Sequence, residues 1–318
     1  MIGRMSSDQI HQSGLDVILD AQKKLSRTQE ELASGKRLLT PADDPVATAQ
    51  IQSIRSELSR IETMQSNISR ASSELAMVED SVANVEGLLM RARELAVRGA
   101  NDSLSLQDRE IIATEVDALR EQLIATANTQ SSDGDYIYAG YAVSAAPYTD
   151  ATVNATYAGD TGVRAINIAP GLTVNTRFAG EAVFGQGSAA TGQLNAFEAL
   201  AVLSAGLRGN ASEAITSLTN NGNAVTQDEA INISMQALDT NLETVRSVRT
   251  QLGVRMNRVD DQQALNANFN VRLQETLSGL EDLDYTKAIT EMNLQMVALE
   301  AAQKAYTKTQ SLSLFNYL

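Results

Sequence analysis

The sequence predicts a mainly α-helical protein, in which an antiparallel, coiled-coil-like helical rod carries paired terminal helices and a small inserted β domain. Two long arrays of apolar residues repeat every seven positions, one in each half of the chain, as in long packed helices. A segment between them is rich in Gly, Thr and Asn and shows short alternating runs, which are typical of strands. Only four prolines occur in the 318 residues, so long helices can continue without interruption.

The first array predicts a helix over residues 46–98. Asp44 is suited to cap its start, and Pro45 is suited to its first position. At about 1.5 Å per residue, this helix is about 80 Å long. Its apolar rows are Ile54, Ile61, Ile68, Leu75, Val82, Leu89 and Ala96, followed three residues later by Met64, Ala71, Val78, Val85 and Ala92.

The second array follows the sequence Thr226-x-x-Glu229, which is the pattern of a capping box, and predicts a helix over residues 226–280. Asn266 is its one polar member, and a lone Asn at such a position commonly fixes the register of packed helices. The apolar members are Ile231, Leu238, Val245, Leu252, Val259, Leu273 and Leu280.

Two shorter helices are predicted beside these arrays. One covers residues 106–128, with Ser105 as its cap and Asp108 placed like the acid of a capping box. It is short enough to fold back against the first long helix. The other covers about residues 194–208.

Weaker heptads mark both ends of the chain, over residues 8–34 and 286–318. Half of the N-terminal stripe is polar, and such helices are marginal unless neighbours surround them. We therefore expect residues before about 40 and after about 286 to be mobile in the free chain and helical in an assembly. The expected packing residues are Ile18, Leu25 and Leu32 with His11, joined by Leu15, Gln22 and Gln29, and at the other end Met292, Met296, Leu299 and Tyr306.

The segment between the arrays predicts a small β domain. Asp133-Gly134 is a turn signal at its start, and further glycines punctuate the residues after this turn. The expected strands cover residues 153–157, 163–169, 172–178 and 181–184.

The two long arrays match in period and length, so we expect their helices to pair antiparallel. The terminal helices then lie together at one end, and the β domain caps the other. The predicted domains are the terminal helices of residues 1–40 and 286–318, a rod domain of residues 41–140 and 190–285, and an outer β domain of residues 141–189.

The composition disfavours several classes of function. A net charge of −14 argues against binding to nucleic acid or to an anionic membrane surface, and no apolar run is long enough for a membrane-spanning helix. Cysteine is absent and His11 is the only histidine, which excludes thiol chemistry and a His-rich metal site. We expect no enzyme activity, no cofactor and no metal.

The charged pairs in the chain have plain structural interpretations. Asp43-Asp44 is expected to be a helix cap rather than a metal or acid pair. Asp282 and Asp284 are expected to be solvated turn residues. The basic pair at residues 36 and 37 could either be solvated or meet an acidic surface of a neighbour.

Two terminal blocks resemble the flagellin family. Residues 32–51, LASGKRLLTPADDPVATAQI, are similar to that family's SGKR…ADDPA…AI block, and residues 281–318, EDLDYTKAITEMNLQMVALEAAQKAYTKTQSLSLFNYL, resemble its C-terminal segment. Residues 128–148, NTQSSDGDYIYAGYAVSAAPY, resemble the hook–filament junction branch of the family, in which a short strand leads into the outer domain. The run at residues 157–164 matches this branch loosely.

The resemblance implies a structural component of the bacterial flagellum, located outside the cell in the junction between hook and filament. It implies export in the unfolded state through the flagellar type III apparatus, without a cleaved signal peptide. The implied partners are other copies of the chain in a ring, the first hook-associated protein on the hook side, flagellin on the filament side and a flagellar export chaperone.

Two other interpretations remain open at this point. The chain could be flagellin itself, the subunit of the filament. It could also be a cytosolic coiled-coil signalling rod, although that hypothesis leaves the β domain and the terminal blocks unexplained. Secretion into the medium distinguishes the signalling rod from the other two, and self-polymerisation distinguishes flagellin from a junction protein.

Overall fold

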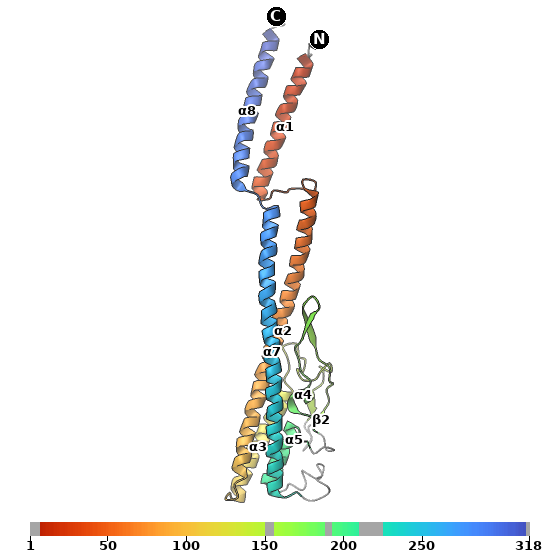
Figure 1. The fold of residues 1–318 in the computed structure, drawn as a ribbon, viewed down its shortest axis with the longest axis vertical. Helices are drawn as coiled ribbons and strands as arrows, with labels where there is room; N and C mark the ends of the chain where they lie inside the picture. Colours follow the sequence, from red (N-terminus) through yellow and green to blue (C-terminus); the bar gives the residue numbers. More distant parts are fainter. Residues whose placement is uncertain (1–6, 150–155, 188–192, 210–224, 316–318) are drawn as a thin grey trace. The chain divides into compact units, whose positions relative to one another are not determined.

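The computed structural model describes residues 7–149, 156–187, 193–209 and 225–315. It divides into two compact units, one of residues 1–61 with 267–318 and one of residues 62–266, which we call the terminal unit and the central unit. The two long helices α2 (Pro45–Gly99) and α7 (Gln227–Glu281) contribute to both units. The prediction of a mainly helical fold with a small β insertion is confirmed (Figure 1).

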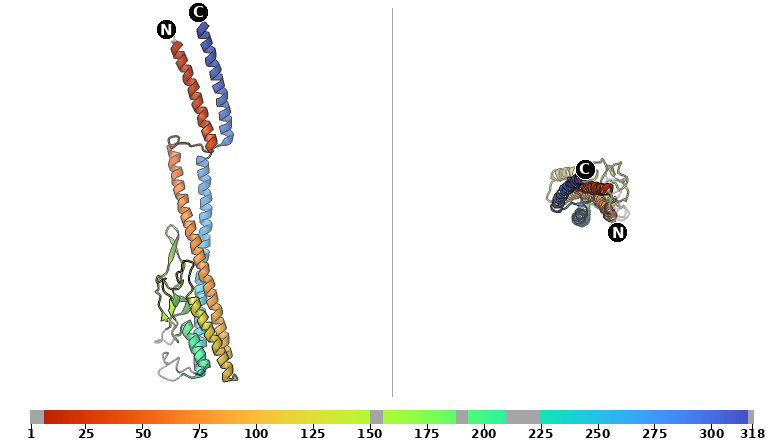
Figure 2. Two further views of the ribbon diagram at one scale, coloured as in Figure 1. Left: turned by 180° about the vertical axis from the view of Figure 1, so that it is seen from behind. Right: turned by 90° about the horizontal axis from the view of Figure 1, so that it is seen from above.

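In the central unit, α2 and α7 run side by side and antiparallel. The ion pairs between the two helices show this direction, because residues with increasing numbers along α2 pair with residues with decreasing numbers along α7. Glu79 pairs with Arg249 at 2.8 Å, and Glu86 pairs with Arg246 at 2.9 Å. Further along, Arg93 pairs with Asp239. Figure 2 shows the same pairing from behind.

The apolar rows of both helices form the core of the central unit. The side chains of these rows are buried, because the heptad spacing keeps each row on the side of its helix that faces the other helices over many turns. The buried members are Ile68, Ala71, Leu75, Val78, Val82, Val85, Leu89, Ala92 and Ala96 on α2, and Ile231, Leu238, Val245, Leu252 and Val259 on α7.

Helix α3 (Leu106–Ala127) folds back antiparallel along α2, as the sequence predicted. Arg91 pairs with Glu115 at 2.6 Å, and the Asn84 amide donates to Thr126 Oγ1 at 3.1 Å. The predicted cap is present, since the Asp108 backbone N–H donates to the hydroxyl of Ser105 at 3.2 Å.

Helix α5 (Ala196–Leu207) packs against α3 and closes the end of the central unit where α2 stops and α7 starts. A side chain at Gly99 would overlap Leu207, and one at Gly206 would lie 3.0 Å from Ala230. The prediction that the β domain caps this end was wrong. The last turn of α5 contacts the end of α2 and the start of α7 there instead, and the side chains of α5 are buried almost throughout.

The β insertion lies beside the α2–α7 pair rather than beyond its end (Figures 1 and 2). Strand β1 (Tyr148–Thr149) pairs with β2 (Thr156–Tyr157), and β3 (Ala165–Ala169) pairs with β4 (Leu172–Asn175), both antiparallel. Asn67 on α2 donates to the Asn167 carbonyl at 3.0 Å, and Arg255 on α7 donates to the Asn175 carbonyl at 3.2 Å. The predicted strand at 153–157 falls partly outside the described residues.

The strand predicted at residues 181–184 is wrong, because this segment forms the short helix α4 (Gly180–Phe184). The short stretch GEAVF, apolar apart from Glu181, fits a buried helical turn as well as a strand, and tertiary contacts decide between them. Gly180 lies against the Tyr148 ring, where a Cβ would come within 2.8 Å of it, and Phe184 is fully buried.

Five aromatic side chains gather at the base of the insertion, although the whole chain has few aromatics. They are connected by ring contacts with centroid distances between 4.7 and 5.3 Å. The phenol of Tyr138 donates to Ser81 on α2 at 2.8 Å, which ties the cluster to the long helix. The cluster consists of Tyr138, Tyr148, Tyr157, Phe184 and Phe197.

Candidate assembly elements

The terminal unit holds the two helices at the ends of the chain, α1 (Ser7–Ser34) and α8 (Tyr285–Phe315), packed side by side (Figure 1). They are antiparallel: Gly14 near the start of α1 faces Tyr306 near the end of α8, and Gly35 just after α1 faces Tyr285 at the start of α8. A Cβ at Gly14 would lie 2.8 Å from the Tyr306 ring, and one at Gly35 would lie 2.8 Å from the Tyr285 hydroxyl. The two helices therefore approach closely at both points.

The predicted large packing residues of the terminal helices are mostly half-buried. The exception is Met296, whose side chain is 42% exposed. The side chain of His11 lies outside the described part of the chain. The half-buried residues are Ile18, Leu25 and Leu32 on α1, and Met292, Leu299 and Tyr306 on α8.

The second row of α1 differs from the expected one. Leu15, Gln22 and Gln29 are exposed. Small residues one position earlier complete the packed face, at Gly14, Ala21, Thr28 and Gly35. Sequence reasoning missed this row because it searched for large apolar side chains, whereas small residues allow two helices to come close together.

A second set of large apolar side chains on the terminal helices is exposed rather than packed between them. A single exposed apolar side chain is common on a protein surface, but here several of them lie on two adjacent helices. We call this set the outer apolar face. It consists of Leu15, Val17 and Leu19 on α1, and Ile289, Leu294, Met296 and Val297 on α8.

The chain segments that connect α1 to α2 and α7 to α8 are bonded to each other. The Arg37 N–H donates to the Glu281 carbonyl at 2.8 Å, and the Leu283 N–H donates to the Gly35 carbonyl at 3.0 Å. The Arg37 guanidinium donates to the Leu280 carbonyl at 2.9 Å. We call this arrangement of residues 35–44 and 280–284 the joint.

One carboxylate occupies the centre of the joint. Glu281 is almost fully buried and accepts hydrogen bonds from Lys36 and, at 2.7 and 2.9 Å, from Arg55. The hydrogen bond from Lys36, and then that from Arg55, lower the pKa of the Glu281 carboxyl below its ordinary value. The basic pair Lys36-Arg37 therefore binds within its own chain, which is neither of the two alternatives left open by the sequence.

The aspartates that the sequence marked are turn and cap residues. The Ala47 N–H donates to Asp44 at 3.0 Å, so Asp44 caps α2 as predicted, and the Lys287 N–H donates to Asp284 at 3.1 Å at the start of α8. Asp43 instead holds the joint, because it accepts from the Thr40 N–H at 2.9 Å and pairs with Arg27 at 2.8 Å. No group of three or more His, Cys, Asp or Glu residues suited to a metal occurs in the described ranges.

A buried ion cluster attaches the insertion to α2, and no pattern in the sequence had indicated it. Arg177 is 2% exposed and donates to Asp135 at 3.3 Å, and its guanidinium lies 3.9 Å from Glu74 of α2. The hydroxyl of Thr176 donates to Glu74 at 2.6 Å. These residues are up to 103 positions apart in the sequence, so local periodicity carries no signal of the cluster.

The run at residues 157–164 forms a tight loop around Asp160. Its carboxylate accepts from the Tyr141 N–H at 2.8 Å and the Gly162 N–H at 2.7 Å, and these backbone hydrogen bonds lower the pKa of Asp160. Gly140 faces the same loop with φ of +71°, and a Cβ there would lie 2.9 Å from the Asp160 carbonyl carbon. The loop therefore needs glycine at position 140 for both space and conformation.

We expect Gly140→Ala to lower the free energy of unfolding of the central unit by about 3 kcal/mol, because it adds a steric overlap to the strain of a positive φ. Gly134→Ala is the matched control: Gly134 also has a positive φ, of +83°, but open space around it. The control should lose only about 1 kcal/mol. If urea unfolding showed the same loss of unfolding free energy for both variants, the proposed steric overlap between position 140 and the Asp160 loop would be contradicted.

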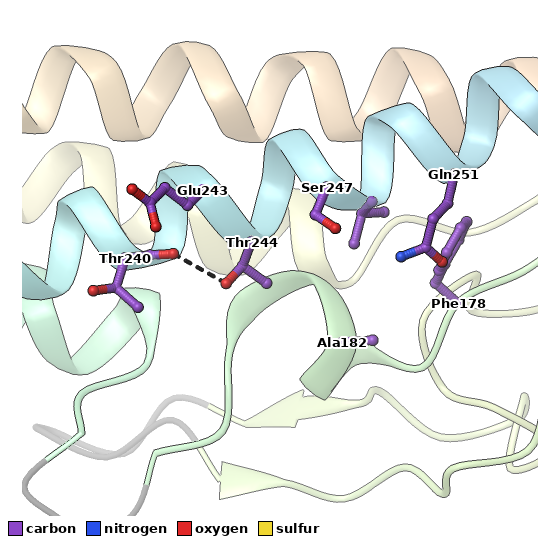
Figure 3. A pocket seen from close by; sticks show the side chains of 8 residues that line it. Phe178, Ala182, Thr240, Glu243, Thr244, Ser247 and Gln251 are labelled. Atoms are coloured by element: carbon purple, nitrogen blue, oxygen red, sulfur yellow. Dashed lines mark hydrogen bonds between the residues drawn. The ribbon is translucent and has the colours of Figure 1, made fainter.

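A shallow groove of about 410 Å³ runs along α7 in the central unit (Figure 3). Phe178 and Ala182 line one side, and polar side chains of α7 line the other. The hydroxyl of Thr244 donates to the Thr240 carbonyl at 3.0 Å, and that of Thr240 donates to the Gln236 carbonyl at 3.0 Å. Both hydroxyls are therefore engaged by the helix itself.

Among the helices that the structure describes, none has the length and apolar character needed to cross a membrane.

Comparisons with known proteins agree with the terminal blocks of the sequence. Residues 6–143 match the bacterial flagellin N-terminal helical region, and residues 235–318 match the bacterial flagellin C-terminal helical region. Flagellar hook-associated protein 3 from Escherichia coli strain K12 is 25% identical over 98% of this chain and 98% of its own length. Flagellin from Listeria innocua is 26% identical over 84% of this chain and 82% of its own length.

The fold has solved counterparts. The flagellar junction protein FlgL from Legionella pneumophila has a TM-score of 0.59 to this chain at 19% identity, covering 73% of this chain and 100% of the FlgL chain. The fold of about three quarters of this chain is thus found in another protein. Matched by both terminal regions, this chain belongs to the bacterial flagellin family.

Proposed function

We propose that the chain is a structural subunit of the bacterial flagellum that forms the junction between hook and filament and gives flagellin a platform for filament growth. The observation that carries the proposal is the end-to-end similarity to flagellar hook-associated protein 3, which covers 98% of both chains. The similarity to Listeria flagellin stops at 84% of this chain. A structural role also agrees with the site, which consists of packing faces.

The terminal helices supply the assembly surface in this proposal. Within residues 1–40 and 286–318, the packing side chains that the structure describes are mostly half-buried, and the outer apolar face is left for neighbours. In a ring, other copies of the chain cover this face, and burial of its side chains stabilises the assembly at about 25 cal/mol per Å² of apolar area. The distal parts of both helices become fully ordered at that stage.

The proposed partners follow from the position in the flagellum. The first hook-associated protein lies on the hook side, flagellin lies on the filament side, and an export chaperone holds the chain before secretion. The route is the flagellar type III apparatus, without a cleaved signal peptide, and the final location is extracellular. No step of this role is enzymatic.

The alternative function is that of flagellin, and the 26% identity to the Listeria flagellin supports it. A filament subunit must stack on its own copies without limit, whereas a junction subunit must fit two different neighbours. Exposed polar residues among the terminal helices, including Gln22, Gln29 and Gln303, favour the junction role because they limit self-association.

Deletion of the gene tests the proposal. We expect deletion cells to export flagellin but lose it to the medium, and we expect the purified protein to stay monomeric or form small oligomers even when seeded. A flagellin blot of the medium and electron microscopy of concentrated protein measure both, with re-expression of the intact chain as the control. Long filaments from this protein alone would identify a flagellin, and normal filaments on deletion cells would remove the junction role.

A further inference from the structure

Polar contacts hold the joint together. Among the described residues of this unit, the buried apolar side chains are few, namely Ala47, Ile51, Ile61 and Ala288. A small apolar core stabilises little, so the polar contacts of the joint carry a large share of its stability. Glu281 is the buried charge among them.

We propose that Glu281 locks the two connecting segments together in the free subunit, so that α1 and α8 leave the joint already in antiparallel register. This inference concerns the single chain and does not rest on the proposed function. In this proposal the joint is ordered in the free chain, whereas the distal turns of α1 and α8 become ordered only when neighbouring subunits pack against them.

The geometry explains why one carboxylate has this effect. Lys36 comes from the first connecting segment and Arg55 comes from α2, so Glu281 brings three parts of the chain together. A buried carboxylate is strongly unfavourable without partners, which means that Glu281 is buried only when both cations are in place. The backbone bonds of Arg37 and Leu283 then close on either side of it.

The register of the terminal helices follows from these backbone bonds. Leu283 donates to Gly35, and Lys36 forms an antiparallel bridge with Asp282, so the end of α1 and the start of α8 are held at the same level. Gly35, with φ of +68°, lets the first segment turn at this point, where Tyr285 lies against it. Gly14 then meets Tyr306 farther along the pair without further adjustment.

Glu281→Gln tests the lock, because it keeps the shape of the side chain and removes its charge. Glu275→Gln is the matched control, an exposed carboxylate on the same helix. Hydrogen exchange in dilute monomer is followed in fragments 35–40 and 281–288. In the unmodified chain, the Arg37 and Leu283 amides should exchange at least about 10-fold more slowly than in an unstructured peptide.

We expect Glu281→Gln to speed exchange at both amides by a similar factor of about 10, while Glu275→Gln changes neither and the Val245 region stays protected in all variants. Unprotected Arg37 and Leu283 in the unmodified chain would overturn the proposal. So would a Glu281→Gln variant in which both amides stay slow, or in which only one of them accelerates. None of these results depends on whether the chain builds a flagellar junction.

Acid provides a second way to open the lock. The charged form of Glu281 is favoured in the joint, so its contribution to stability is complete above the ordinary carboxyl pKa and is lost as the pH falls through the lowered one. The charges that bind it are Lys36 and Arg55, and Arg37 and Asp282 lie in the neighbouring segments of the joint. On acidification the unmodified chain should approach the exchange rates of Glu281→Gln, and a persistent difference between them would contradict the lock.

Discussion

Leu75→Asp should abolish the cooperative unfolding transition of the central unit at room temperature. Leu75 is fully buried in the row of α2 that faces the core, and it shares that core with the rows of α7. The substitution removes the apolar contacts of a leucine, at about 2–5 kcal/mol, and adds a buried carboxylate without a partner, which costs several kcal/mol more. The sum approaches the roughly 5–15 kcal/mol that stabilises a typical domain.

Ala76→Asp is the control for this experiment, because it places the same charge one residue later, on an exposed position of α2. Its melting temperature, followed by circular dichroism, should stay near that of the unmodified chain. Val245→Asp on α7 should behave like Leu75→Asp, since Val245 is equally buried and the two helices share one core. A melting temperature unaffected by Leu75→Asp would refute the antiparallel pairing.

The helices of this fold could be predicted because their signal is long and local. The heptad row from Ile54 to Ala96 repeats often enough to exclude chance, and caps such as Asp44 and Thr226 mark where helices begin. The start of α7 shows the capping box directly, with the Thr226 N–H donating to Glu229 at 2.9 Å and the Glu229 N–H donating back at 3.4 Å. Period and caps are properties of neighbouring residues, which a sequence displays.

The parts that sequence reasoning missed depend on contacts between distant residues. Arg177 looks like any exposed arginine until Asp135 and Glu74 are brought next to it by folding. The helical turn at residues 180–184 forms because the aromatic cluster surrounds it, and its own sequence is equally compatible with a strand. The role of Glu281 was hidden for the same reason, since its partner Arg55 is 226 positions away.

The terminal helices are an intermediate case. Their heptad period could be recognised in the sequence, but the residues that form the packed side of α1 could not all be identified. The row of Ile18, Leu25 and Leu32 is half-buried in the structure. The accompanying row was taken from Leu15, although Gly14 is the residue that faces Tyr306. A glycine carries no hydrophobic signal, so its packing role appears only when its partner is known. The side chain of Leu15 is exposed and belongs to the outer apolar face.

Leu294→Asp should prevent incorporation of the chain into the flagellum without destabilising the free subunit. Leu294 lies on the outer apolar face and is 66% exposed, so a charge there stays in water in the monomer and should change its stability by less than about 0.5 kcal/mol. In the proposed ring a neighbouring copy covers this face, and the carboxylate would be buried without a partner at a cost of about 3 kcal/mol or more. At about 1.4 kcal/mol per factor of ten, each subunit contact weakens by about 100-fold.

Asn293→Asp is the matched control, since it adds the same charge one residue earlier, at an exposed position that is already polar. Cells that express Leu294→Asp in place of the unmodified chain should lose swimming motility and release flagellin into the medium, while the control should swim normally. Equal melting temperatures of the purified monomers would show that the defect arises in assembly rather than in folding. Motile Leu294→Asp cells with full-length filaments would mean that no subunit covers this face, because a ring that tolerated about a 100-fold loss at every contact would not remain closed under the load of a growing filament.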